Sequence, residues 1–230
     1  MVTLLTRASR LALDLVFPPQ CAICRRQGAM LCATCVAGLP VADGDRCDRC
    51  WIASRASPCG DCRTSLLAFD SARSAFVFDG NAREAVHRFK YQGLHALAEP
   101  MAALMLAHAD LTDIDLIVPV PLHRRRERAR GYNQAALLAK SLAAHAGVRS
   151  DVGAAKRVRA TAPLAKATGR AERLEIVRDA FRAAPERVEG RRVMLVDDVI
   201  TTGATLDACA SALLAAGARG VRCVTWARTD

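Results

Sequence analysis

The chain has 230 residues, enough for one domain or two modest domains, and 52% of them are hydrophobic against 24% charged. This composition excludes disordered and collagen-like proteins, and no apolar run approaches the ~18 residues that cross a membrane as a helix. Lys and Arg number 33 and Asp and Glu 23, so the formal net charge is +10, which is compatible with a polyanionic partner.

Residues 1–19 predict a short amphipathic helix. Apolar side chains recur there at helical steps of four, three and four, and Pro18 and Pro19 end the helix. Asp14 interrupts the apolar stretch and no small-residue cleavage site follows, so we expect no signal peptide and a cytoplasmic location. The recurring residues are Leu4, Ala8, Leu11 and Leu15.

Residues 20–65 hold eight of the ten cysteines, arranged as four CxxC pairs. The spacing C-x2-C-x7-C-x2-C is followed by C-x2-C-x8-C-x2-C, which is an internal repeat. In a reducing compartment clustered thiols favour a metal over disulfides, and four thiolates on two tight turns form the closed tetrahedral site of structural zinc. The repeat therefore predicts a double zinc ribbon with two zinc ions. The ligands are Cys21, Cys24, Cys32, Cys35, Cys47, Cys50, Cys59 and Cys62.

The spacing leaves the pairing of the cysteines open. Each repeat can hold its own zinc, or a cross-brace can join the first CxxC pair of one repeat to the first pair of the other. Redox-active CxxC pairs and an iron–sulfur cluster are alternative chemistries, although redox CxxC sites typically occur singly beside a βαβ unit. Cys209 and Cys223 lie in a predicted helix and a predicted strand, and we expect both to be core thiols.

From residue 66 onward the pattern changes to alternating strands and helices. Short continuous apolar runs are typical of buried parallel strands, and Gly147 and Gly217 follow two of the helices as C-terminal caps. The alternation predicts an α/β domain over 66–230, with a parallel sheet flanked by helices. The expected strands are 74–78, 116–120, 192–196 and 221–226, and the expected helices are 82–91, 99–110, 134–146 and 204–216.

Residues 193–205 carry the most informative motif. An apolar run leads into Asp197 and Asp198, and open α/β sheets bind ligands at the carboxyl ends of such strands. Carboxylates there can accept hydrogen bonds from a vicinal diol and approach a divalent cation. The Thr-Thr-Gly-Ala-Thr that follows opens a helix with free N–H groups and hydroxyls, which suits a phosphate dianion. The segment predicts a site for a ribose 5-phosphate, and helix capping by one Asp is the simpler alternative.

The same segment resembles, position by position, the PRPP-binding signature of the type I phosphoribosyltransferases. The resemblance implies that Asp197 and Asp198 bind the ribose hydroxyls and assist Mg2+. Purine salvage members have a carboxylate where this chain has Thr201, so removal of a purine proton by this loop is not expected. The resemblance places the 5-phosphate on Thr201, Thr202, Gly203, Ala204 and Thr205.

The predicted strand 116–120 leads directly into a loop rich in arginine. A leaving pyrophosphate needs positive donors because its charge grows as the C–O bond breaks, and Arg offers bidentate contacts suited to that. The resemblance places pyrophosphate binding at this loop, on His123, Arg124 and Arg125. A solvated basic face is the alternative.

Three further sequence features extend the resemblance to the ComF family, the ComFC- and GntX-like competence proteins. They are the VPVPLH run with RGYNQ at 130–134, FKYQG at 89–93, and the four CxxC pairs, so the resemblance spans 21–230. It implies a phosphoribosyltransferase-like domain behind a zinc-ribbon head and a role in natural transformation. It also implies PRPP as ligand, with single-stranded DNA and a DNA-uptake helicase as further partners. Possible lid or signature residues are Lys90, Arg130, Gly131, Asn133 and Gln134.

Between Arg159 and Phe181 this chain departs from the ComF pattern. Thr161-Ala162-Pro163-Leu164 stands where the family commonly has Thr-x-x-Gln, and an Asn is usual near Ile176. If those polar groups touch the acceptor or a lid, substrate choice or turnover differs in this chain.

Two functions follow from the sequence. The first is Mg2+-dependent displacement of pyrophosphate from PRPP by a nitrogen acceptor, for which no general base is assigned. The second is a nucleic-acid-binding protein that uses PRPP or a nucleotide as a ligand. Tyr132 is the one aromatic residue in the cationic run, so phosphate contacts rather than base stacking would dominate binding to DNA.

Overall fold

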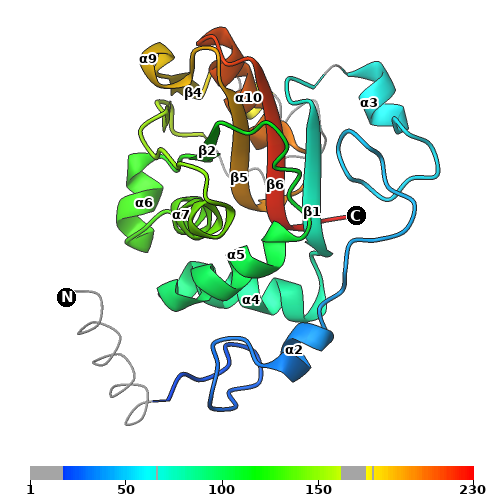
Figure 1. Ribbon diagram of the computed structural model, residues 1–230, viewed down its shortest axis with the longest axis vertical. Coiled ribbons are helices and arrows are strands. Elements are labelled where there is room, and N and C mark those ends of the chain that lie inside the picture. The colour runs from blue at the N-terminus through cyan, green and yellow to red at the C-terminus, as the bar shows by residue number, and fades with distance from the viewer. Residues whose placement is uncertain (1–17, 66, 162–174, 178) are drawn as a thin grey trace.

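The computed structural model describes residues 18–65, 67–161, 175–177 and 179–230. The helix predicted before Pro18 lies outside the described residues, and so does most of the segment that departs from the ComF pattern. In the described part, a sheet lies at the centre with helices around it, and the two cysteine repeats lie at separate places beside it (Figure 1). The predicted α/β architecture with a cysteine-rich region ahead of it is therefore confirmed.

The central sheet is parallel throughout, with the order β1-β6-β5-β2. β5 lies between β6 and β2 and extends beyond β2, since Pro119, the last residue of β2, pairs with Val196 while β5 continues to Ile200. β5 and β6 are longer than the predicted runs because they continue through polar residues that interrupt the apolar pattern. The strands are β1 Ser71–Val77, β2 Leu116–Pro119, β5 Arg192–Ile200 and β6 Gly220–Arg228.

Helices cover both faces of this sheet. Successive strand residues point to opposite faces, and in β5 Leu195 belongs to the core that includes α10, whereas Val196 belongs to the core that includes α4, α5 and α7. The bounds predicted for α7 are confirmed because Asn133 caps its first turn and Gly147, with φ of +67°, ends it. The helices are α4 Gly80–Tyr91, α5 Ala98–Leu106, α7 Gln134–Ala146 and α10 Ala204–Ala215.

The predicted cationic loop after β2 is a helix, α6 (Arg124–Arg130), so that prediction was wrong. The side chain of His123 caps it by accepting a hydrogen bond from the N–H of Arg125, and Gly131, with φ of +85°, ends it. Arg is a good helix former, but none of the residues of α6 is buried. An exposed helix has no apolar period, and its sequence is therefore hard to distinguish from a charged loop.

Several short elements were not predicted, because each has only three to five residues. The antiparallel pair β3–β4 packs against α10, and a five-residue helix follows the third cysteine of each repeat. The described residues contain no helix that is both long and apolar enough to span a membrane. The short elements are α2 Ala33–Ala37, α3 Gly60–Thr64, η1 His95–Leu97, β3 Ala155–Arg157, β4 Phe181–Ala183 and α9 Pro185–Val188.

Candidate functional site

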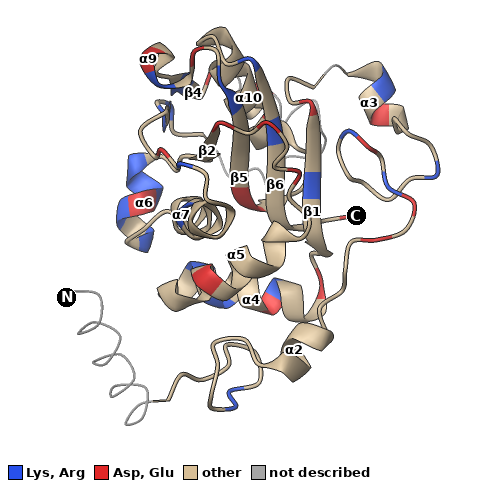
Figure 2. Ribbon diagram, in the orientation of Figure 1, with Lys and Arg blue, Asp and Glu red and all other residues tan. Residues whose placement is uncertain are grey.

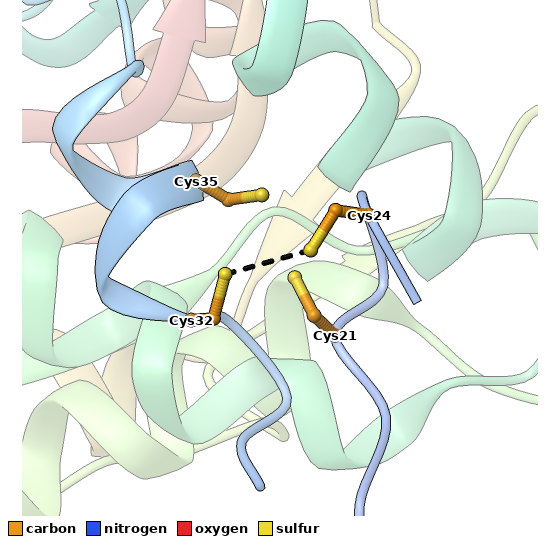
Figure 3. Close-up of side chains that lie close together, drawn as sticks. All are labelled: Cys21, Cys24, Cys32 and Cys35. Atoms are coloured by element: carbon orange, nitrogen blue, oxygen red, sulfur yellow. Dashed lines mark hydrogen bonds between the residues drawn. The ribbon is translucent and has the colours of Figure 1, made fainter. Parts of the chain in front are cut away.

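Each cysteine repeat gathers its own four sulfur atoms, all within 4.8 Å of one another. Figure 3 shows the first set, in which the side chains of two tight segments converge and the Sγ atoms of Cys24 and Cys32 lie 3.5 Å apart. The pairing left open by the sequence is thus one site per repeat, and the cross-brace is excluded. Four convergent sulfurs fit a tetrahedral zinc ion with no open position, so the chain has two structural zinc sites. We call Cys21, Cys24, Cys32 and Cys35 the first tetrad, and Cys47, Cys50, Cys59 and Cys62 the second tetrad.

Backbone N–H groups surround the first sulfur of each tetrad. The N–H of Cys59 donates to Cys47 Sγ at 3.3 Å. Burial raises the pKa of Cys47, but hydrogen bonds from the backbone of Cys50, Cys59 and Arg49 outweigh it and bring the pKa to about 6. The same balance of burial against backbone N–H groups brings the pKa of Cys21 to about 6. Since zinc binds the thiolate, this environment fits metal ligation.

The predicted acidic pair lies at the carboxyl edge of the sheet, where β5 extends beyond β2. Asp198 is 6% exposed, and Lys90 of α4 lies against it, with Nζ 2.7 Å from Asp198 Oδ1. The carboxylate of Asp197 instead contacts the backbone, and its Oδ1 accepts a hydrogen bond from the N–H of Asp198 at 2.8 Å. Because successive strand residues point to opposite faces, the two carboxylates straddle the strand end.

The two carboxylates differ in their electrostatic surroundings. Burial, followed by the charge of Asp198, raises the pKa of Asp197 to about 7, while Lys90 and Arg157 oppose the rise. Asp198 has a lysine ammonium in direct contact. A cation bound beside Asp197 would therefore relieve an unfavourable charge, whereas Asp198 already has a partner.

Residues 201–205 form the bend between β5 and α10, which we call the phosphate bend. Gly203 has φ of +82° and precedes the first residue of α10. The hydroxyl of Thr202 is buried and has no hydrogen-bond partner among the described residues. The first N–H groups of a helix also lack intrahelical partners, and the helix dipole favours an anion there. The bend thus has the donors that a phosphate group needs.

Two clefts share His123 in their lining. One of about 580 Å³ is lined by His123, Arg124 and Arg157 among others, and another of about 300 Å³ by His123, Arg125 and Arg157 among others. The structure thereby separates Arg124 from Arg125, which the sequence grouped together. His123 and Arg157 contribute to both clefts.

Comparisons with known proteins agree with both parts of the chain. The phosphoribosyl transferase domain model matches residues 132–229, and the double zinc ribbon domain model matches residues 12–63. DNA utilization protein YhgH of Escherichia coli K12 is 30% identical over 228 residues, covering 94% of this chain and 99% of that protein. Competence protein F of Haemophilus influenzae is 32% identical over 200 residues, covering 76% and 87%. The chain belongs to the ComF family. Competence protein ComFC of Bacillus subtilis is 29% identical over 201 residues, covering 81% and 79%.

Arg157 is a site residue of this ComF-family chain that the sequence analysis missed. It lies on β3, its guanidinium is 5.2 Å from the centre of the Phe181 ring, and it donates to the hydroxyl of Thr161. Its Nε is buried without a hydrogen-bond partner in the described part of the chain. Nothing in the local sequence distinguishes it from the neighbouring arginines, because its position depends on the pairing of β3 with β4.

Some of the residues that carried the resemblance to the ComF family make contacts between neighbouring elements. Asn133 donates from Nδ2 to the carbonyl of Val120 at 3.0 Å and also caps α7, so it ties the end of β2 to that helix. Arg130 donates to Gln134 Oε1 at 2.6 Å, and its guanidinium lies 5.4 Å from the centre of the Tyr91 ring. Together they hold the chain between the two clefts and α4.

Tyr132 does not offer a stacking surface, since it is only 9% exposed and its ring packs against Phe89 and His95. The exposed aromatic residue near the arginines is Tyr91, at 66% exposure. Burial raises the pKa of Tyr132, which remains a neutral phenol in the core.

Proposed function

We propose that this ComF-family protein binds PRPP with Mg2+ and transfers its phosphoribosyl group to a nitrogen acceptor. One observation carries the proposal: β5, which has Asp197 and Asp198 near its carboxyl end, runs directly into a bend with a buried hydroxyl that has no hydrogen-bond partner among the described residues, followed by a helix N-terminus. A diol and a phosphate held side by side describe a ribose 5-phosphate. The match to the phosphoribosyl transferase domain model supports the same ligand class.

Each part of the site has a separate task in this proposal. The carboxylates bind the ribose hydroxyls, and the phosphate bend binds the 5-phosphate. Arg124, Arg125 and Arg157 line the clefts beside β2, where the pyrophosphate group would lie. Their guanidinium groups stabilise the charge that develops on the departing oxygen.

The transfer breaks the bond between the anomeric carbon and the pyrophosphate oxygen, which leaves with the electron pair. The acceptor nitrogen forms the new bond to that carbon with its lone pair and then loses a proton to solvent. Carboxylate oxygens are ligands that Mg2+ prefers, so Asp197 and Asp198 fit this ion. Magnesium, when bound with PRPP, neutralises part of the pyrophosphate charge.

Thermal unfolding tests the binding step. With Mg2+ and PRPP at about one hundred times Kd, the melting temperature is expected to rise by about 5–10 °C. D198N should remove most of this rise, measured against its own ligand-free melting temperature, while E186Q, which removes an exposed charge on α9, should retain it. No rise in the wild-type protein loaded with zinc would overturn the proposal.

Pyrophosphate release tests the transfer step. The protein is incubated with Mg2+, PRPP and, in turn, each of a panel of nitrogenous bases and amines. Release with one acceptor identifies the enzyme and its substrate class. Binding of PRPP without release for any acceptor would instead favour a ligand-binding role.

The surface of α6 favours a second function, binding of single-stranded DNA through its phosphates. Arg124, Arg125, Arg126 and Arg128 are exposed on this short helix, which Figure 2 shows as a concentration of positive charge. An R125Q/R126Q/R128Q variant should bind a labelled single-stranded oligonucleotide more weakly. The slope of log K against log salt concentration should fall in magnitude by about 2. D198N should leave that affinity unchanged if the two surfaces are distinct, and a salt-independent affinity would contradict phosphate recognition.

A further inference from the structure

A buried arginine lies between the second tetrad and the phosphate bend. Arg228, at the end of β6, is 2% exposed. Its Nη1 donates to the carbonyl oxygen of Cys50, and its Nη2 donates at 3.3 Å to the carbonyl oxygen of Thr201. Its Nε lies 3.5 Å from a carboxylate oxygen of Asp230. One side chain therefore joins the backbone of a zinc ligand to the first residue of the phosphate bend.

The segment that follows the second tetrad makes two more contacts with the same region. The N–H of Ala68 donates to Asp207 Oδ1 in α10 at 2.6 Å. A Cβ on Gly203 would lie 3.7 Å from the Phe69 ring, so the ring packs under the left-handed glycine of the bend. All four cysteines of the second tetrad also share one buried core cluster with Ile200. The second tetrad, through Arg228, and the segment that follows it therefore contact the phosphate bend at Thr201 and Gly203, and the segment also contacts the first turn of α10 at Asp207.

We propose that the second tetrad supports the phosphate bend through Arg228, so that losing zinc from this tetrad opens the bend and weakens phosphate binding. Arg228 is then a positioning residue, because it acts on the ligand through the backbone of Thr201. The planar guanidinium donates to the two carbonyl groups from two separate nitrogen atoms in a fixed geometry, which the single nitrogen of an ammonium does not reproduce. The identity of the ligand rests on the proposed function, but the coupling between zinc and the bend does not.

Charge favours the same coupling. Four thiolates and one Zn2+ carry +2 − 4 = −2, and this charge complements the buried guanidinium of Arg228. Arg228 also lies close to the carboxylate of Asp230. That carboxylate is not available to Arg228 alone, because its Oδ1 pairs with Arg46 as well. The zinc-loaded second tetrad is therefore the arrangement in which burial of Arg228 is best compensated.

The first tetrad provides a matched control, because it contacts the sheet domain at a different helix. Asn81 of α4 donates to the carbonyl of Cys35 at 2.9 Å, and α4 lies on the face of the sheet opposite to α10. Cys32 and Cys59 are the third cysteines of the two repeats. We expect C32S and C59S each to remove one zinc, but only C59S to affect the bend.

Hydrogen–deuterium exchange of the full chain tests this coupling without a ligand. Exchange is followed in peptides that cover 201–205, with α7 as the reference for global unfolding, and zinc content is measured by mass spectrometry. C59S should raise exchange of the bend about tenfold or more, and R228K, which retains both zinc ions, should raise it about fivefold, as expected for loss of one hydrogen bond. C32S should leave it within about twofold of wild type.

A second arm measures stabilisation by PRPP with Mg2+ in the same four proteins. Loss of stabilisation in R228K and C59S but not in C32S supports the positioning role. Unchanged exchange of the bend in R228K would overturn it, and this result remains decisive if C59S also opens α7. A wild-type protein that does not respond to PRPP would overturn the proposed function, while the exchange result would still decide the coupling.

Discussion

The two cysteine tetrads have the same ligands and nearly the same spacing, but they are embedded differently. All four cysteines of the second tetrad are buried, whereas in the first tetrad Cys24 is exposed and Cys32 is half-buried. The second tetrad belongs to the core under α10, while apolar neighbours of the first tetrad, such as Leu31, belong to the core under α4. Identical metal chemistry can therefore serve a peripheral ribbon in one place and the domain core in another.

The two ribbons also approach the candidate site from opposite sides. The second reaches the phosphate bend through Arg228. The first contacts α4 through Asn81, and α4 carries Lys90, which pairs with Asp198. The site thus lies between two metal-supported segments, one beside the phosphate bend and one on the side of the acidic pair.

Metal removal is expected to produce the largest effect. Each zinc site contributes apparent folding free energy of about 10–16 kcal/mol, but the exposed first tetrad should lose its zinc to a chelator first. Loss of the second zinc should then loosen the core under α10 and lower the melting temperature of the sheet domain. Zinc release measured with a colorimetric chelator, alongside thermal unfolding followed by circular dichroism, should show two phases, with the melting temperature falling mainly in the second. Simultaneous release of both ions would show that the difference in burial between the two tetrads does not affect how tightly they hold zinc.

Breaking the ion pair between α4 and β5 should have the next largest effect. K90M leaves Asp198 buried without its cation, which should cost about 3 kcal/mol of unfolding free energy in denaturant titrations. Adding D198N to K90M should recover most of this loss, because both charges are then gone. K140M, at an exposed position on α7, is the control and should change stability little. An equal loss in K90M and K140M would show that the pair contributes nothing.

The raised pKa of Asp197 predicts a pH-dependent effect of D197N. The folded state binds the proton more tightly than the unfolded state, because burial raises the pKa of Asp197 from 3.8 to about 7. The contribution of this group to stability therefore falls as pH rises between about 4 and 7. The free energy of unfolding of D197N should therefore increase relative to that of wild type as pH rises across this window, and the difference should level off above about pH 7. A constant difference between the two proteins from pH 4 to 8 would contradict the raised pKa.

The smallest effect is expected at the contact between the first ribbon and α4. N81A removes the hydrogen bond to the carbonyl of Cys35, which is worth about 1 kcal/mol. Zinc release from the first tetrad should become about fivefold faster. Release from the second tetrad should stay as in wild type, and a change there would show that the two ribbons are coupled through α4.

Predictions from sequence were most accurate where a local physical pattern was strong. The spacing of the CxxC pairs indicated two metal sites, and Gly147 marked the end of α7. They were least accurate where no apolar period exists, as in the exposed helix α6, or where an element has only three residues, as in β3. Arg157 was missed for the second reason, since it lies on β3, and the pairing of β3 with β4 sets the position from which its charge acts on Asp197.

By itself the sequence determined the class of the fold, the ligands of two zinc ions and the strand–bend–helix motif with its acidic pair, because these depend on residue type and short-range spacing. Only the tertiary structure decided which cysteines share a metal, that Lys90 faces Asp198, and that Arg228 links the second tetrad to Thr201. The contacts of Arg228 join residues 27 and 178 positions apart, and the separation between Lys90 and Asp198 falls between these two values. No local pattern encodes such separations, since they arise when strands distant in the chain pair side by side in one sheet.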